Sequence, residues 1–335
     1  MNDKTQLILN FINESSSNMP YVLKDKLIRD GKKLKYRFEF EEIKNSIDEF
    51  IEGNELNRFI VLPGIRGVGK TTLAVAVSKI LGLDYKRVQF TPDVLPADIT
   101  GFSMYNAKTD SFEYRPGAAM TNLLLADEIN RTSPKTQSAL LEIMEEGSIT
   151  VDGVTHPVPS PFIVIATENP IGSSGTQLLP ESQLDRFMIC TSLGYPSHQD
   201  AITILKDRTR EQLTGLTPVL TAEELITIRR DVQNIHVADS IYDYIVTLTE
   251  HTRTDSHLAS GASPRASLSL LNMAKAMAFL NLRDYVIPED IITVLPDVFG
   301  HRIRLSHTAK AKGMTQKQVL ERVIDSVALP ATTTK

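Results

Sequence analysis

The sequence lacks three features that would each have pointed to a particular class of protein. It has a single cysteine, Cys190, so no disulfide can form within the chain and a reducing compartment is expected. Its apolar runs, such as those at 162–166 and 123–126, are far shorter than the roughly 20 residues that span a bilayer. The chain does not begin with a basic start and a long apolar stretch, so no signal peptide is expected. These absences favour a cytoplasmic protein.

Excess positive charge and metal-ligand clusters are also missing. The chain has 36 Lys and Arg against 41 Asp and Glu, a net charge of −5, which disfavours binding of nucleic acid through bulk charge. Its seven histidines form neither an H-E-x-x-H motif nor a cluster with cysteine, so no zinc site is predicted. What remains is an ordinary globular composition, 41% hydrophobic over 335 residues, which is enough for about two domains.

Short apolar runs alternate with helical patterns through the first 196 residues. Runs at 59–62, 87–90, 122–126 and 162–166 have the length of buried strands, and 71–81 and 134–146 have helical spacing. This alternation predicts an α/β fold with a parallel sheet covered by helices. Beyond Pro196 the pattern is mostly helical. We therefore expect a polar N-terminal segment at 1–37, an α/β nucleotide-binding domain at 38–196 and an all-helical domain at 197–330.

A phosphate-binding loop is predicted between the first of these strands and the helix that follows it. The pattern G-x-x-x-x-G-K-[ST] is matched by consecutive residues, and one more threonine follows: Gly64, Ile65, Arg66, Gly67, Val68, Gly69, Lys70, Thr71 and Thr72. The glycines let backbone N–H groups curl around a triphosphate at the positive end of the helix dipole. Lys70 would reach the β- and γ-phosphates and the Thr71 hydroxyl would hold Mg²⁺. The loop predicts binding of ATP and Mg²⁺.

Polar side chains follow two of the other strands. The run 123–126 ends in Asp127 and Glu128, and the run 162–166 is followed by Asn169. Ligands of open α/β sheets lie at the carboxyl ends of the strands, so these residues should face the phosphate loop. Asp127 is then placed to anchor Mg²⁺ through a water molecule, and Glu128 to orient and polarise the attacking water. Asn169 could contact the γ-phosphate or a water, although Asn-Pro alone is only a turn signal.

Taken together, these motifs resemble AAA+ ATPases, and specifically the MoxR family. The resemblance extends over about 71–327 and is carried by the strings at 89–93, 95–101, 127–131, 134–142, 166–170, 184–187, 261–266 and 301–305. The fold it implies is a P-loop ATPase core with a parallel sheet and a C-terminal helical lid. The segment at about 36–72 looks more like archaeal-type P-loop ATPases.

The resemblance also implies roles for single residues. Asn169 would be the sensor-1 residue, Arg186 the arginine finger that reaches a neighbouring subunit's nucleotide, and Arg265 the sensor-2 residue. The alternatives are an ion pair of Arg186 with Asp185 or Glu181, and an ordinary surface arginine at 265. Residues 98–118 and 147–157 resemble the family's inserts, the second as a β-hairpin with an Asp-Gly turn. Such inserts engage partners in the family, and passive loop packing is the alternative.

The function this implies is Mg²⁺-dependent ATP hydrolysis by a ring of identical subunits, expected to be a hexamer. The work would be remodelling or maturation of client proteins, which in this family often carry von Willebrand factor A domains. Two other classes stay open: a nucleic-acid or chelatase-type motor subunit, and a scaffold that binds ATP without turnover. Salt-dependent DNA binding would favour the motor.

Overall fold

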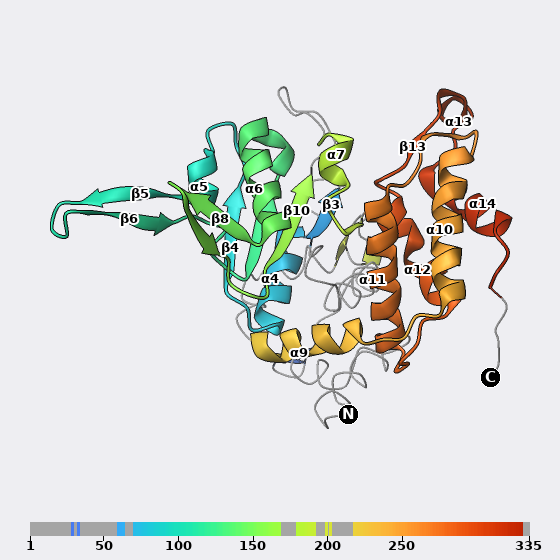
Figure 1. Ribbon diagram of the computed structural model, residues 1–335, viewed down its shortest axis with the longest axis horizontal. Coiled ribbons are helices and arrows are strands. Elements are labelled where there is room, and N and C mark those ends of the chain that lie inside the picture. Colours follow the sequence, from blue (N-terminus) through green and yellow to red (C-terminus); the bar gives the residue numbers. More distant parts are fainter. Residues whose placement is uncertain are drawn as a thin grey trace.

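The computed structural model describes residues 70–168, 179–191, 198–199, 201–202 and 217–330, and the backbone of short strands at 28–29, 32–33 and 59–63. For Lys70 the structure likewise describes only the backbone. Figure 1 shows two parts side by side, a sheet with its covering helices and a group of helices formed by the later residues. Within the described ranges, no helix is both long and apolar enough to cross a bilayer. The predicted boundary at Pro196 and the end of the predicted segment at 1–37 lie outside the described residues.

The centre of the first part is a five-stranded sheet in which all neighbours are parallel. Its order is β11-β3-β10-β7-β4. In chain order the strands are β3 (Phe59–Pro63), β4 (Tyr85–Gln89), β7 (Leu123–Asp127), β10 (Ile163–Glu168) and β11 (Ile189–Cys190). Every residue of β7 and β10 is buried, which is why these strands are apolar up to their polar carboxyl ends. The four strands predicted from the sequence are confirmed, and β11 forms one edge.

The helices of this part begin and end where the sequence supplies caps. In α6 (Pro134–Glu146) the Ser133 side chain accepts a hydrogen bond from the Thr136 N–H, Pro134 takes the first position, and Gly147 ends the helix with φ 62°. Both this helix and α4 (Lys70–Ile80) were predicted to within a residue. Shorter elements complete the part: α5 (Pro96–Thr100), η1 (Ile129–Arg131) and α7 (Glu181–Leu184).

Two hairpins extend from the sheet. Strands β5 (Gly101–Asn106) and β6 (Ser111–Pro116) form a long ribbon that projects away from the body in Figure 1. Strands β8 (Ser148–Val151) and β9 (Val154–Pro157) form the second, joined at Asp152 and Gly153 with φ 51° and 80°. Positive φ at both central residues is typical of the tight hairpin turn that Asp-Gly favours, so the predicted hairpin is confirmed. A two-stranded ribbon of β1 (Ile28–Arg29) and β2 (Lys32–Lys33) lies earlier in the chain.

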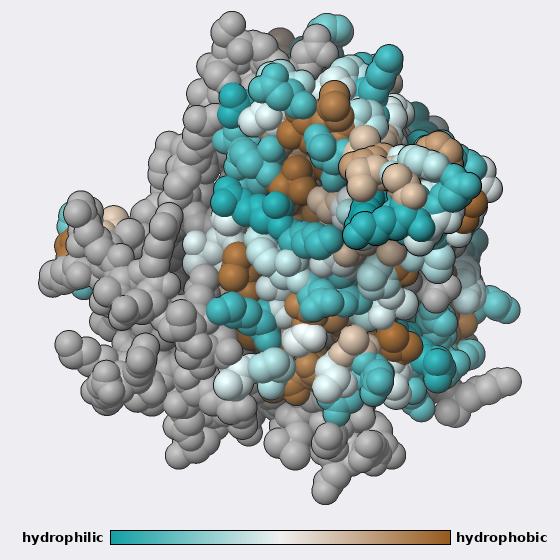
Figure 2. Space-filling model, turned by 90° about the vertical axis from the view of Figure 1, so that its left-hand side faces the viewer, coloured by the Kyte–Doolittle hydropathy of each residue, from teal (hydrophilic) through white to brown (hydrophobic). Residues whose placement is uncertain are grey.

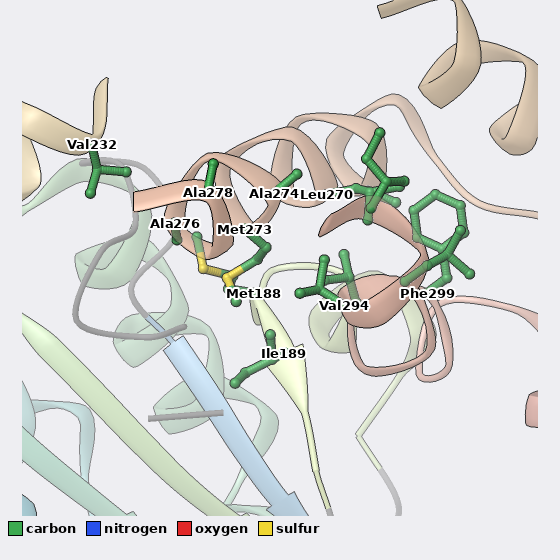
Figure 3. Packing of buried hydrophobic residues seen from close by; sticks show 14 of the residues in the cluster. Met188, Ile189, Val232, Leu270, Met273, Ala274, Ala276, Ala278, Val294 and Phe299 are labelled. Atoms are coloured by element: carbon green, nitrogen blue, oxygen red, sulfur yellow. The ribbon is translucent and has the colours of Figure 1, made fainter. Parts of the chain in front are cut away.

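The second part is built mainly from helices. They are α9 (Ala222–Gln233), α10 (Asp239–Thr254), α11 (Pro264–Leu280), α12 (Pro288–Phe299), α13 (His307–Ala311) and α14 (Gln316–Ser326), with a small ribbon of β12 (Leu258–Ser260) and β13 (Arg304–Leu305). In Figure 3, Met188, just before β11, lies next to Met273 of α11, and both belong to one cluster of buried apolar residues with Ile189 and Ala276. The two parts therefore share one continuous apolar core.

Polar contacts also join the two parts, around the turn between α7 and β11. Asp185 in this turn accepts hydrogen bonds from the hydroxyl of Ser263, the residue that caps α11, and from Nε of Arg302, at 2.9 and 3.0 Å. The ring Nε2 of His301 lies 3.0 Å from the Phe187 carbonyl oxygen. Since that oxygen can only accept, His301 donates through Nε2–H. The turn that carries Arg186 is thus held by the C-terminal helical part.

The buried His301 should make stability depend on pH. Burial, and then the positive charge of Arg302, lower its pKa from 6.5 to about 3. Between pH 6.5 and 3, His301 binds a proton in the unfolded chain but not in the folded chain. The free energy of unfolding therefore decreases as the pH is lowered, by up to about 1.4 kcal/mol per pH unit. His301→Gln keeps an N–H donor but cannot titrate. Its free energy of unfolding should fall less steeply between pH 6 and 4 in urea titrations, and equal slopes would contradict this assignment.

Candidate active site at the carboxyl edge of the sheet

The two acids predicted from the sequence lie together at the carboxyl end of a central strand. Asp127 is the last residue of β7, and Glu128 follows it in the left-handed conformation, with φ 56° and ψ 48°. That conformation costs a residue other than glycine roughly 1–2 kcal/mol, and such strain concentrates at functional sites. The turn sends the chain away from the sheet into η1 directly after the second acid.

The Asp127 carboxylate is oriented by two threonine hydroxyls. Thr167 of β10 donates to Oδ1 at 2.6 Å, and Thr71 of α4 donates to Oδ2 at 3.3 Å. The Thr167 hydroxyl in turn accepts the backbone N–H of Glu128 at 2.9 Å. One side chain of the neighbouring strand therefore binds the Asp127 carboxylate and the backbone of Glu128. The contact between Thr71 and Asp127 brings together the two residues predicted to hold Mg²⁺.

The environment of Asp127 keeps its carboxyl ionised. Burial alone would raise its pKa, but hydrogen bonds from Thr167, Arg87 and Thr71 and the charge of Arg87 outweigh burial, so the pKa lies below its ordinary value. An ionised carboxylate beside a hydroxyl is a donor set of the kind that Mg²⁺ binds, with phosphate oxygens and waters completing the shell. In the described residues, no three His, Cys, Asp or Glu side chains converge to hold a metal on their own. The residues present therefore fit a Mg²⁺ ion that arrives with a nucleotide.

The Glu128 carboxylate is paired within its own turn. Its Oε2 lies 2.6 Å from Nη1 of Arg131, three residues on, and the Glu128 side chain is only 14% exposed. A partly buried pair of this kind holds the carboxylate in one direction. The sequence string at 127–131 contained this arginine, but nothing in the string indicated that it would bind the acid.

Several predicted site residues lie outside the described residues. They are Gly64, Ile65, Arg66, Gly67, Val68, Gly69 and Asn169, together with the side chain of Lys70. Their positions along the chain are informative even so, because β3 ends at Pro63 and α4 begins at Lys70. Strand β3, just before these residues, lies beside β10, the strand that precedes Asn169, and α4 follows them in the chain. Thr72 is in the first turn of α4 and is exposed.

The two arginines implied by the family resemblance share one carboxylate. Arg186 Nη1 lies 2.7 Å from Glu145 Oε2, and Arg265 Nη2 lies 2.6 Å from Glu145 Oε1. Arg265 also approaches Asp185, at 3.7 Å. The alternative partners considered for Arg186 were wrong: Asp185 pairs with Arg302 and Arg265, and Glu181 with Arg304. The Arg265 side chain is 40% exposed, so its roles as a sensor-2 residue and as a surface arginine both stay predictions.

A pocket adjoins this arginine pair. It has a volume of about 420 Å³, lies between α6 and α7, and is lined by charged side chains that include Glu142, Glu145 and Arg186. The Oε1 atom of Gln183, also in its wall, is buried without a hydrogen-bond partner. Sequence reasoning missed Glu145 as well as Thr167, because each acts through a residue that is distant in the sequence.

Comparisons with known proteins agree with this geometry. A model of the ATPase family associated with various cellular activities (AAA) matches residues 59–189, and a model of the AAA lid domain matches 250–323. Chaperone MoxR1 of Mycobacterium tuberculosis is 39% identical over 285 residues, 81% of this chain and 74% of MoxR1. The chain belongs to the MoxR family of AAA+ ATPases.

Other relatives support the same assignment. The uncharacterized protein YeaC of Bacillus subtilis is 48% identical over 272 residues, which are 81% of this chain and 85% of YeaC. A crystal structure of a candidate ATPase from Cytophaga hutchinsonii superposes with a TM-score of 0.82 at 33% identity and covers 98% of this chain and 97% of its own. The fold is thus the AAA+ P-loop ATPase fold, with a parallel sheet core and a helical lid, and the protein is an ATPase. The likeness of 36–72 to archaeal-type ATPases stays a prediction.

Proposed function

We propose that the protein hydrolyses ATP with Mg²⁺ at sites completed between the subunits of a ring, expected to be a hexamer, and uses the energy to remodel client proteins. In this proposal Gly64–Gly69 and Lys70 bind the phosphates, and Asp127 and Thr71 hold Mg²⁺. The ion would offset charge on the β- and γ-phosphates. Glu128 orients the water, and Asn169 contacts the γ-phosphate or that water.

The observation that carries the intersubunit proposal is the separation between the acids and the arginine pair. Asp127 ends β7 at the carboxyl edge, whereas Arg186 precedes the amino end of β11. Strands β7 and β11 are three positions apart, about 14 Å across the sheet. Arg186 is thus poorly placed for the nucleotide of its own subunit. A neighbouring subunit could present its nucleotide to this face.

The position of Glu145 supports the same separation. Helix α6 starts near the carboxyl edge, where Thr136 donates to the carbonyl of Val94, just beyond the end of β4. Its 13 residues extend about 20 Å from there, so Glu145 near the last turn lies far from the acids. Arg186 and Arg265 are bound to this distant carboxylate. We infer that both act on the same nucleotide, supplied by the neighbour.

Mixing two inactive variants tests the intersubunit site. Arg186→Ala should lower turnover by about 10³–10⁵-fold with ATP binding retained, since a finger stabilises charge in the transition state. Glu128→Gln lacks the water-orienting group. In mixed rings the Arg186→Ala subunit keeps Glu128 and can receive Arg186 from its Glu128→Gln neighbour. If subunits exchange at random, about a quarter of the sites regain both groups, because each interface is head-to-tail.

The measurement is the ATPase rate of the equimolar mixture beside each variant alone at the same total concentration. Recovery toward a quarter of the wild-type rate supports a shared site. An Arg186→Ala protein with normal turnover would remove the finger assignment. Two inactive variants that stay inactive after subunit exchange would place Arg186 in its own subunit's site.

The exposed apolar residues of the β5–β6 hairpin support the proposed binding of client proteins. Phe102, Met104 and Tyr105 are 45–51% exposed and Phe112 is 74% exposed. Figure 2, which looks onto the hairpin end of the molecule, shows apolar residues in small separate patches among hydrophilic ones. Tyr114 of β6 stacks on His156 of β9 at 3.9 Å, so the two hairpins are in contact at their bases. We propose clients with von Willebrand factor A domains, as the family resemblance implies.

A further inference from the structure

Arg87 makes a close contact with the carboxylate proposed to bind Mg²⁺. Strand β4 pairs with β7 so that Gln89 lies opposite Asp127, which brings the Arg87 side chain beside the same acid. Its Nη2 and Nε donate to Asp127 Oδ2 at 2.6 and 3.2 Å, and Nη2 also donates to Gln89 Oε1 at 3.0 Å. Two bonds from one guanidinium to one oxygen make this a specific contact.

The oxygen that Arg87 binds is the one a metal ion would need. Asp127 Oδ1 already accepts the short hydrogen bond from Thr167, at 2.6 Å. Oδ2 faces the hydroxyl of Thr71, the second proposed magnesium ligand, at 3.3 Å. A cation bound between Thr71 and Asp127 would therefore adjoin the guanidinium, and like charges at that distance repel strongly.

The two partners differ in how easily they can separate. The Arg87 side chain is 45% exposed and lies on β4, an edge strand of the sheet, whereas the Asp127 side chain is 10% exposed. The arginine can turn into solvent on a long flexible stem, and the carboxylate is held by Thr167. If one partner moves when a metal ion arrives, it is Arg87.

We propose that Arg87 is an internal competitor of Mg²⁺ at Asp127: it occupies the metal-facing oxygen in the nucleotide-free subunit and must leave when the metal nucleotide binds. This inference rests on the proposed function, because it takes Asp127 and Thr71 as the magnesium ligands. Its consequence is that the protein requires more Mg²⁺ for tight nucleotide binding than its ligands alone would need. Arg87 thereby tunes the metal dependence of the site without contacting the reacting atoms.

The test is a magnesium titration of nucleotide binding, without turnover. The affinity for fluorescent mant-ATP is measured in Glu128→Gln protein, with and without Arg87→Met. The protein is first treated with EDTA, and the Mg²⁺ concentration is then raised stepwise. The midpoint is the Mg²⁺ concentration that gives half of the total increase in mant-ATP affinity. In Arg87→Met it should fall about fivefold, the equivalent of about 1 kcal/mol for a partly exposed pair. Arg87→Lys, which keeps the charge, should stay nearer the parent protein.

Arg115→Met is the matched control. Arg115 is 51% exposed, lies on the β5–β6 hairpin and pairs with Glu113 at 3.6 Å, so the same substitution there should leave the midpoint unchanged. An unchanged or raised midpoint in Arg87→Met, in a protein that still binds mant-ATP, would overturn this inference alone. If none of the proteins binds mant-ATP at any Mg²⁺ concentration, the proposed function itself fails.

Discussion

Glu128→Gln should lower the turnover number for ATP by about 10²–10⁴-fold, because it removes the carboxylate that orients and polarises the attacking water. The change keeps the size of the side chain and leaves Asp127, Thr71 and Thr167 in place. The hydrogen bond from the Glu128 backbone N–H to Thr167 is also unaffected. The affinity for ATP should therefore change little, and the loss should lie in turnover alone.

Steady-state ATPase assays and mant-ATP titrations on the same preparations measure the two effects. Glu146→Gln is a suitable control, since this exposed glutamate at the end of α6 undergoes the same chemical change away from the acids. It should retain wild-type turnover. Residual activity of Glu128→Gln within a few-fold of the wild type would show that another group orients the water.

Arg302→Met should lower the free energy of unfolding by about 3–5 kcal/mol, since it breaks a buried pair and leaves Asp185 with only the more distant Arg265, at 3.7 Å. The Arg302 side chain is 1% exposed, and burial is the main reason that its pKa falls to about 10, still far above neutral pH. Besides the Asp185 carboxylate it donates to several oxygens, which are the carbonyls of Asp185, Phe187, Met188 and Val298 and the hydroxyl of Ser269. Only a planar guanidinium offers five donors to such a set.

A neighbouring residue provides the comparison. Arg304 is 54% exposed and pairs with Glu181 at 3.2 Å, so Arg304→Met should change stability by about 0.5 kcal/mol or less. Urea unfolding followed by circular dichroism compares the two variants. Equal losses would contradict the role of Arg302 in joining the lid to the turn that carries Arg186. If Arg302→Met cannot be purified, Arg302→Lys should show a smaller but still distinct loss.

Local patterns in the sequence were sufficient for four strands of the parallel sheet, helices α4 and α6, the second hairpin and the place of the two acids. The apolar runs predicted the central strands because β7 and β10 are buried on both faces. Caps at Ser133 and Gly147 and the Asp-Gly turn at 152–153 act over a few residues, so α6 and the second hairpin were predictable. Asp127 and Glu128 followed from the rule that parallel strands deliver their ligands at the carboxyl edge. The family strings identified the fold and the ATPase.

The contacts that orient those residues depended on the tertiary structure. Arg87 meets Asp127 only because β4 pairs with β7 in one register, and neither strand order nor register is written in either strand alone. Glu145 meets Arg265 across 120 positions of sequence, at the junction between the core and the lid. For Arg186 the sequence suggested nearby acids, Asp185 and Glu181, yet both are taken by other arginines. The sequence by itself determined four strands of the parallel sheet, the two helices that follow the phosphate loop and the acids, and the second hairpin, through short-range propensity and burial. The tertiary structure decided which charge binds which, because ion pairs form by proximity in space.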